Sequence, residues 1–388
     1  MKLPSYFKTV FTLIFFVFSL MAVSYVLPSL LLARGFSSWQ TGVIVSAFFI
    51  GATLARPLGS FAIERLGIKR TILSSAVVGA VVALAYPLGG MWTLIVSRFI
   101  VGMCYGIIYV AATTWEELVV TPEDRGRLFG YFCLASIIPQ FIIVPISEFL
   151  IDTGLENAFM LLSTAILVLL IFYTLRQPLT TEIVKDEKEM AWGTWGDLLR
   201  LRETWAILSC TFVLCMTGTA CIQYIPNLMR LIGLKGTFYT WSLTAGSVVV
   251  RLFFCAMLLT RYDRRTLLCI WSAAEAVPLL YSAYSSTVPA FVISGILFGV
   301  SHGINYPALC AIIPDVLPPH LLPKGTALYL LCNDLPPVLM PLLIGVVPAS
   351  FGLAGLMKVI AVIALLAFPV IYWGLWRHPP LRSKGVSA

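Results

Sequence analysis

A small set of ionisable side chains lies deep inside long apolar stretches of this sequence. The set comprises Arg56, Arg98, Glu148, Arg251, Glu275, His302 and Asp334. A charge placed in hydrocarbon costs roughly 2.5–3.5 kcal/mol on insertion scales, so such side chains pair with one another or face a wet cavity. The chemistry open to them is ion pairing, reversible proton binding and recognition of a polar solute.

The elements that must position these side chains are membrane-spanning helices. The chain has 388 residues, of which 59% are hydrophobic and 11% charged, and its mean hydropathy is +0.94. Soluble domains carry roughly a quarter of charged residues. Twelve apolar segments approach the ~20 residues that span a bilayer, and the alternation typical of barrel strands is missing. The sequence therefore predicts an all-α polytopic membrane protein with spans at 9–33, 39–63, 70–88, 92–115, 128–151, 155–176, 204–231, 237–260, 266–285, 288–313, 325–349 and 353–376.

The distribution of Lys and Arg predicts the orientation. With both termini in the cytoplasm, only Arg34, Arg230 and Lys235 of the loop cations fall outside, as the positive-inside rule favours. We therefore expect a multi-pass protein of the plasma (inner) membrane, whose first segment is a retained helix and not a signal peptide. The net charge of +8 is a topology signal, which argues against a nucleic-acid partner. The nine cysteines lack metal-ligand spacing, so neither a metal nor a cofactor is expected.

The chain divides into two similar halves. We expect a six-helix bundle at 1–177, a cytoplasmic linker with an amphipathic helix at 178–203 and a second bundle at 204–388. Arg56 precedes Arg251 by 195 residues, and Tyr109 precedes Tyr306 by 197. Gly102 and Gly106 match Gly299 and Gly303 at the same offset of 197. This regularity predicts a duplicated six-helix unit, the pseudo-repeat design of transporters with a midplane binding site.

Several motifs resemble those of the major facilitator superfamily. "SFAIERLGIK" at 60–69 is similar to the family's G-x-x-x-D-R-x-G-R-K loop, with Ser60 for the first glycine and Glu64 for the aspartate. "RFIVGMCYG" and "PEDRGRLFGY" resemble the helix-four and helix-five motifs. The resemblance implies twelve helices, a cavity lined by helices one, four, seven and ten, and a monomer. It also implies a cytoplasmic gate that latches the outward-open state, although these charges serve equally as topology signals. The gate residues are Ser60, Glu64, Arg65, Gly67, Lys69, Arg125 and Gly126.

Depth along the helices nominates ion pairs. Arg56 lies about 12 Å along its helix from Glu64, a depth similar to that of Asp334 in helix eleven. Helices two and eleven are neighbours in family members, so the resemblance makes Arg56–Asp334 a candidate inter-half pair, with a static structural charge as the alternative. Matching depths also nominate Arg251–Glu275 within the second half. Glu148 is a candidate partner for Arg98.

One stripe of helix four carries Arg98, Gly102, Tyr105, Tyr109 and Glu116, whose offsets nearly complete whole turns. The stripe either presents a cation and phenol rings to a solute or packs a neighbouring helix through Gly102 and Gly106. The repeat adds His302 and Tyr306, and His302 is either simply hydrogen-bonded or a proton carrier. The expected polar lining is completed by Tyr25, Gln140, Gln223, Tyr224, Asn227 and Asn305.

These features favour a secondary transporter of a small organic solute that works by alternating access. Export follows from Arg56-Pro57-Leu58, which resembles a motif of efflux-type members, and coupling to protons stays open. An importer, such as a proton symporter for a metabolite or a metal chelate, is the alternative, and a membrane sensor is a remote one. No clustered catalytic set or phosphate loop supports an enzyme.

Overall fold

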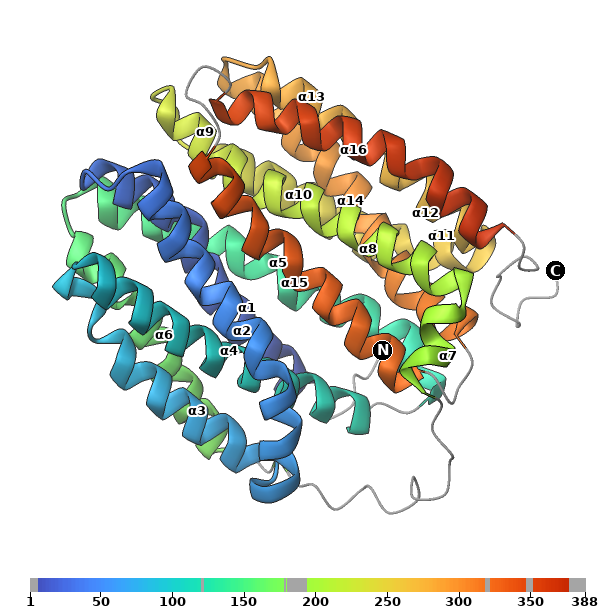
Figure 1. The fold of residues 1–388 in the computed structure, drawn as a ribbon, viewed down its shortest axis with the longest axis horizontal. Coiled ribbons are helices and arrows are strands. Elements are labelled where there is room, and N and C mark those ends of the chain that lie inside the picture. The colour runs from blue at the N-terminus through green and yellow to red at the C-terminus, as the bar shows by residue number, and fades with distance from the viewer. Residues whose placement is uncertain are drawn as a thin grey trace. The chain divides into compact units, whose positions relative to one another are not determined.

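The computed structural model describes residues 6–119, 122–177, 179, 194–317, 322–346 and 352–376 (Figure 1). The described part is helical and contains no strand. The helices of the first half are α1 (Phe7–Ala33), α2 (Ser38–Leu66), α3 (Ile68–Ala83), η1 (Tyr86–Leu88), α4 (Met91–Val119), α5 (Pro122–Asp152) and α6 (Glu156–Leu175). Those that follow are α7 (Trp195–Arg200), α8 (Arg202–Thr219), η2 (Ala220–Tyr224), α9 (Ile225–Leu231), α10 (Thr237–Phe253), α11 (Cys255–Arg261), α12 (Arg264–Ala274), α13 (Ala276–Ala283), α14 (Val288–Val316), α15 (Leu322–Val346) and α16 (Gly352–Leu375).

The helices are long and apolar enough for a membrane protein. Among the described residues, ten segments satisfy both criteria for crossing a bilayer, and Leu328–Ile344 is a shorter apolar helix. The predicted span 237–260 is divided, because α10 ends at Phe253 and α11 starts at Cys255. The prediction of an all-helical polytopic fold is confirmed.

Prolines explain two irregular places in the second half. A proline has no N–H for the carbonyl four residues earlier, and its ring crowds that carbonyl. Pro278 therefore interrupts the helix at its i−4 carbonyl, Ala274, and Glu275 stands at the joint between α12 and α13. Pro226 likewise follows η2, a π-helical turn, and π-helical turns are frequent at functional sites.

The described helices form two compact units. The first comprises residues within Met1–Leu128, Phe132–Glu187 and Pro341–Val346, and the second comprises the rest, mainly Lys188–Met340 and Val347–Ala388. In the first unit α2 packs along α4, and α3 packs against α4 and α6. In the second unit α10 packs along α14, and α8 packs against α16.

Glycines let the main helix pair of each unit approach closely, and they do so at matching positions. A Cβ at Gly102 would collide with the carbonyl oxygen of Phe48, and a Cβ at Gly299 with that of Leu243. The two contacts occupy equivalent positions in the two halves, because Phe48 precedes Leu243 by the same 195 residues as Arg56 precedes Arg251. Small residues at such contacts are typical of membrane helix packing. The predicted duplication is therefore present in the packing itself.

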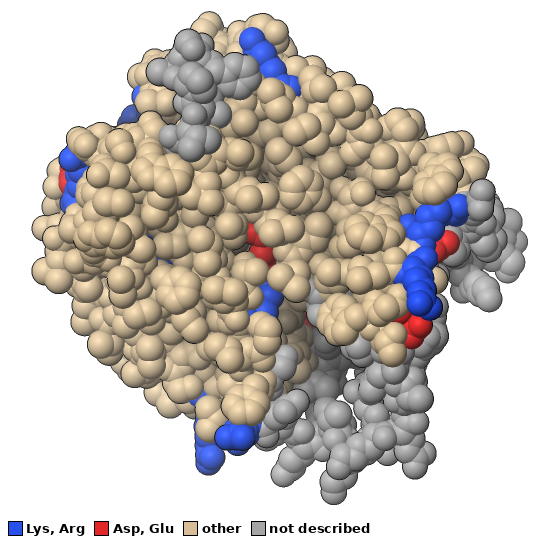
Figure 2. Space-filling model, in the orientation of Figure 1, with Lys and Arg blue, Asp and Glu red and all other residues tan. Residues whose placement is uncertain are grey.

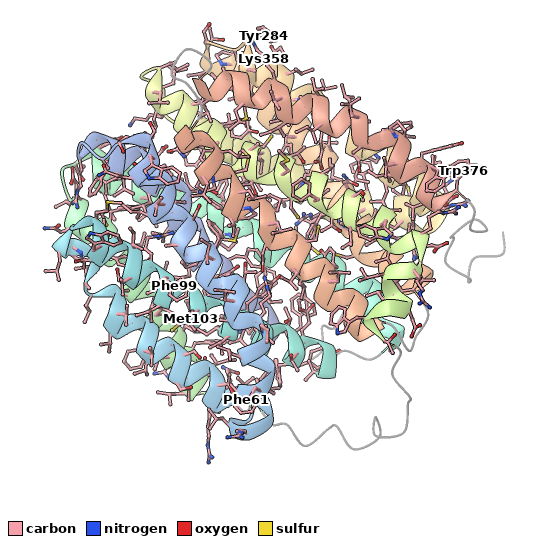
Figure 3. The ribbon with its side chains drawn as sticks, in the orientation of Figure 1. Phe61, Phe99, Met103, Tyr284, Lys358 and Trp376 are labelled. Atoms are coloured by element: carbon pink, nitrogen blue, oxygen red, sulfur yellow. The ribbon has the colours of Figure 1, made fainter. Side chains whose placement is uncertain are left out.

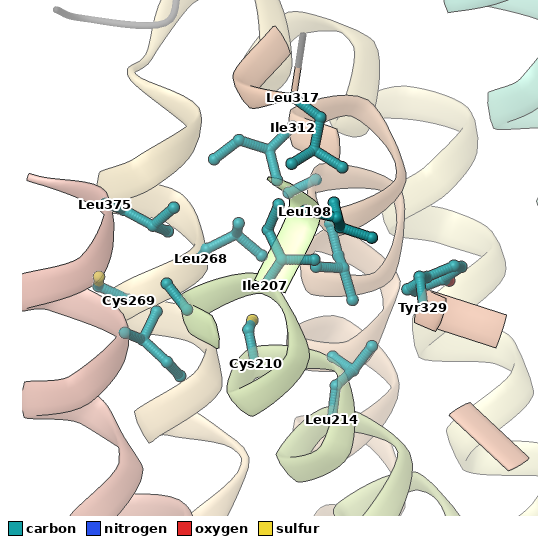
Figure 4. Packing of buried hydrophobic residues seen from close by; sticks show 14 residues of the cluster. Leu198, Ile207, Cys210, Leu214, Leu268, Cys269, Ile312, Leu317, Tyr329 and Leu375 are labelled. Atoms are coloured by element: carbon teal, nitrogen blue, oxygen red, sulfur yellow. The ribbon is translucent and has the colours of Figure 1, made fainter. Parts of the chain in front are cut away.

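A further apolar cluster fixes one end of the second unit. It joins buried side chains of α7, α8, α12, α14 and α16, among them Leu198, Ile207, Leu268 and Ile312 (Figure 4). The short helix α7 begins at a capping box formed by Thr194 and Asp197. Its Leu198 is fully buried, so α7, which falls in the predicted amphipathic linker, is anchored to the second unit by packing. The preceding residues of that linker, 180–193, lie outside the described residues.

Candidate functional site

A buried arginine marks the first unit. Arg98 on α4 is only 2% exposed. Its Nη2 donates to Ser24 Oγ at 2.9 Å and its Nε to the carbonyl oxygen of Ile44 at 3.3 Å. The guanidinium also lies 5.0 Å from the ring centre of Phe48. All of these partners are neutral, and the suggested partner Glu148, which is buried on α5, is not among them.

An aromatic ladder continues from this arginine along α4. The ring of Tyr105 lies 5.1 Å from that of Phe48 and 6.0 Å from that of Tyr109. Arg56 of α2 lies over the Tyr109 ring, 5.1 Å from its centre. The structure therefore brings Arg98, Tyr105 and Tyr109 together with Arg56, as a ladder with a cation at each end. Gly102 packs against α2, as the packing interpretation of the stripe expects, and presentation of the stripe to a solute stays a prediction; Glu116 is buried further along the helix.

A buried carboxylate marks the second unit. Glu275 is fully buried at the α12–α13 joint. Thr217 of α8 donates its hydroxyl to Glu275 Oε2. Asn305 Nδ2 donates to Oε1 at 3.3 Å, and His302 Nδ1 lies 3.3 Å from the same oxygen. Hydroxyl, amide and imidazole groups from α8 and α14 surround the carboxylate, and the predicted partner Arg251 is not among these contacts.

The second unit has its own aromatic ladder. The His302 ring stacks on Phe298 at 5.1 Å and lies 5.9 Å from the ring of Tyr306. Arg251 of α10 lies over Tyr306, 5.8 Å from the ring centre. The cation over Tyr306 repeats the Arg56–Tyr109 contact of the first unit. His302 takes the place of Tyr105, as the offset predicts, and it connects this ladder to Glu275.

The remaining predicted lining residues are buried polar groups. Gln223 and Tyr224 belong to η2, and Asn227 of α9 donates to the Gln223 carbonyl. Among the described residues, Gln223 Nε2, Tyr224 Oη and Gln140 Oε1 are buried without a hydrogen-bond partner. Leaving such a group unsatisfied costs about 1–3 kcal/mol. Each of these three atoms therefore keeps an unused hydrogen-bonding capacity within its own unit. Tyr25 on α1 is buried as well.

The predicted gate residues from 60 to 69 lie at the end of α2 and the start of α3, where Gly67 adopts a φ of 75°, whereas Arg125 and Gly126 lie in α5. Lys69 Nζ donates to the carbonyl oxygens of Leu175 and Gln177, at 3.0 Å and 2.8 Å. Lys69 thus binds the end of α6, and Arg65 lies over the ring of Phe61. The side chains of Ser60, Glu64 and Arg125 lie outside the described part of the structure.

Two residues of the Glu275 cluster were missed from the sequence. Thr217 and Ser272 are single hydroxyls in apolar helices, and Ser272 Oγ accepts from Asn305 Nδ2 at 3.2 Å. Ser24, the partner of Arg98, was missed in the same way. A hydroxyl at the depth of a buried ion on a neighbouring helix is the signal that could have found them. The Arg56–Asp334 pair, which would join the two units, stays a prediction.

Comparison with known proteins identifies the family. The sequence matches the Major Facilitator Superfamily over residues 9–251 and 228–388. The chain belongs to this superfamily. Its members are transporters, not enzymes, and the multi-pass membrane character of the chain follows from membership and from its apolar helices.

Individual relatives resemble shorter stretches or the fold alone. The uncharacterized MFS-type transporter YcaD of Shigella flexneri is 28% identical over 116 residues, and the match spans 30% of this chain and 30% of YcaD. A D-xylose transporter of Levilactobacillus brevis is 34% identical over 98 residues, or 25% of this chain and 21% of that protein. The nucleoside transporter NupG has a TM-score of 0.77 at 13% identity and covers 95% of this chain and 99% of NupG. The Escherichia coli xylose transporter XylE in its inward-open conformation also has a TM-score of 0.77 at 13% identity, with 97% of both chains covered.

Proposed function

We propose that this protein is a proton-coupled secondary transporter of a small organic solute that works by alternating access, with Glu275 and His302 as the proton-binding pair. One observation carries the proposal. Glu275 is fully buried in a membrane helix and touches an imidazole nitrogen. An ionisable group at such a depth is costly and is a functional site by default.

The surroundings of Glu275 suit both of its protonation states. The Thr217 hydroxyl, the Asn305 amide and a protonated His302 nitrogen are donors for the charged carboxylate. A neutral carboxylic acid can donate to the unprotonated imidazole instead. A proton can therefore be held by the pair without any large rearrangement. The ring contact of His302 with Tyr306 links the pair to the ladder under Arg251.

We assign the direction as export, on the resemblance of Arg56-Pro57-Leu58 to efflux-type members. The protein would act as a monomer in the inner membrane with both termini in the cytoplasm. Import of a sugar-like solute is the second candidate, which the partial similarity to a D-xylose transporter favours. In either direction the solute would contact the buried polar atoms of Gln223 and Tyr224 in η2.

Transport by membrane vesicles tests the proposal. Labelled D-xylose, a labelled nucleoside and a cationic dye are offered to right-side-out and inverted vesicles, with and without a pH gradient. The account expects one of the solute classes to move in a gradient-dependent way, and Glu275→Gln to lose that dependence. Ser282→Ala is the matched control, since it removes another fully buried hydrogen bond, to Ser294, in the same unit. Movement that ignores the gradient in the unmodified protein would contradict the coupling.

A further inference from the structure

One end of the second unit holds an arginine whose described partners are all neutral. Arg202, the first residue of α8, donates through Nη2 to the carbonyl oxygen of Gly374 at 3.5 Å. Its guanidinium lies 4.8 Å from the ring centre of Trp373. Its Nε is buried and has no hydrogen-bond partner among the described residues. A carbonyl and an aromatic ring hold this cation in place without neutralising it.

The neighbouring arginine provides the contrast. Arg265, in the first turn of α12, lies 5.2 Å from the ring centre of Trp376. Asp263 accepts hydrogen bonds from its guanidinium, at 2.9 Å and 2.5 Å, and from its backbone N–H at 3.1 Å. Arg265 is therefore internally compensated and structural. Arg202, by contrast, has no carboxylate among its described partners.

The aromatic partners of both arginines face outward. Trp373 is 60% exposed and Trp376 is 46% exposed, and Tyr372 stacks on Trp376 at 4.4 Å. Figure 3 shows Trp376 at one end of the second unit, with Lys358 and Tyr284 at the other. Tryptophans at the end of a membrane helix are typical of the headgroup level of a bilayer. Basic side chains, with acidic ones beside them, lie on this side of the unit, where Figure 1 places α11 and α12 (Figure 2).

Apolar surface continues from these tryptophans along α16. Leu365, Leu366 and Val370 are exposed on the helix that carries Trp373. An occupant of this surface therefore needs an anionic group for Arg202, an amphipathic region beside the indole rings and an apolar tail along α16. A free phosphate or a small organic anion supplies only the first of these. A phospholipid with a net negative headgroup supplies all three.

We infer that this end of the second unit, formed by the start of α8 and the end of α16, binds the headgroup of an anionic phospholipid. Arg202 contacts the phosphate, Trp373 covers the glycerol region and the acyl chains run along α16. Because α8 and α16 pack against each other, one lipid contacts the first and last membrane helices of the unit together. This site is independent of the proton-binding pair and of the transported solute.

Lipid retention by the purified full-length protein tests the site. The protein in neutral detergent is mixed with phosphatidylglycerol, phosphatidylcholine or inorganic phosphate. Bound lipid is counted by native mass spectrometry, and the melting temperature is recorded in parallel. The variants are Arg202→Gln, Arg202→Lys and Trp373→Leu. The matched control is Arg70→Gln, which removes one exposed positive charge from α3 in the other unit.

The site predicts retention of phosphatidylglycerol over phosphatidylcholine and a higher melting temperature with the anionic lipid. Arg202→Gln is expected to weaken this retention about fivefold, the usual contribution of one basic side chain near a lipid surface. Arg202→Lys and Arg70→Gln should retain it. Equal retention by Arg202→Gln and Arg70→Gln, or equal retention of the two lipids, would overturn the inference, as would full competition by inorganic phosphate. If Arg202→Gln does not elute as a single species, Trp373→Leu decides: lower retention supports the site, and unchanged retention contradicts it.

Discussion

The two units share a packing scheme but differ in the ion at the centre of each described cluster, Arg98 in the first and Glu275 in the second. Each has a close glycine contact between paired helices and an arginine over a tyrosine, Arg56–Tyr109 in one and Arg251–Tyr306 in the other. The first unit adds buried Arg98, at a position where the 197-residue offset gives Gly295 in the second. The second adds buried Glu275 with His302. The helix packing that the two units share is structural. The central ion, which differs between them, is where we expect their roles to differ.

The chemistry of the two ions differs accordingly. An arginine stays protonated in proteins, so Arg98 can only be held in place by Ser24, Ile44 and Phe48. A carboxylate beside an imidazole can exchange a proton. We therefore expect substitution of the first ion to change stability and substitution of the second to change coupling.

The largest effect on stability is expected at the equivalent glycines of the two units. Gly102→Ala and Gly299→Ala each force a methyl group onto a backbone carbonyl oxygen, of Phe48 and Leu243. Overpacking of this kind costs about 1–3 kcal/mol or more. Both variants should lower the melting temperature in detergent by similar amounts. Gly196→Ala, which meets only ordinary contact with Thr194, is the control. If Gly102→Ala lowered the melting temperature and Gly299→Ala did not, the two helix pairs would not be equivalent.

Arg98→Gln should have the next largest effect. It leaves the acceptors Ser24 Oγ and Ile44 O without their donor, at a cost of about 1–3 kcal/mol. We expect a lower melting temperature with gradient dependence of transport retained. Glu275→Gln keeps an acceptor oxygen and should be nearly as stable as the unmodified protein. Loss of coupling in well-folded Arg98→Gln would show that the first ion is not merely structural.

The paired tyrosines should show a smaller, symmetric effect. Tyr109→Leu and Tyr306→Leu remove the ring under Arg56 and Arg251, and a cation–π contact is worth about 0.5–2 kcal/mol. Tyr→Phe at either position keeps the ring and should leave the melting temperature almost unchanged. A strong effect of Tyr306→Phe alone would locate a hydroxyl-dependent role in the second unit only.

The smallest effect is expected at Lys69. Its ammonium group binds the carbonyl oxygens of Leu175 and Gln177 at the end of α6, and a cation there contributes about 0.3–1 kcal/mol. Lys69→Met should lower the melting temperature slightly. Lys69→Arg, which keeps the positive charge, should have the melting temperature of the unmodified protein. A large change in transport without a change in stability would favour the latch role that the loop motif suggested.

The sequence predicted the framework better than the ion contacts. Regular offsets identified the repeat, and Gly102 with Gly106 indicated the close helix contact. Depth along a helix placed Arg251 and Glu275 at one level, but depth does not determine the direction in which a side chain points. Pro278 introduces a joint after Ala274, where the chain departs locally from helical geometry. A side-chain direction calculated from about 3.6 residues per turn does not include this departure. Glu275 consequently meets Thr217, His302 and Asn305, which a count of residues could not foresee.

The most direct test compares Glu275→Gln with Arg98→Gln in the same vesicle assay, using the solute found in the transport screen. The account predicts that an imposed pH gradient drives net accumulation with Arg98→Gln, scaled to the amount of folded protein. It predicts no gradient-driven accumulation with Glu275→Gln, although downhill movement of the solute continues. Gradient-driven accumulation by Glu275→Gln at the level of the unmodified protein would contradict the assignment of the proton to the second unit.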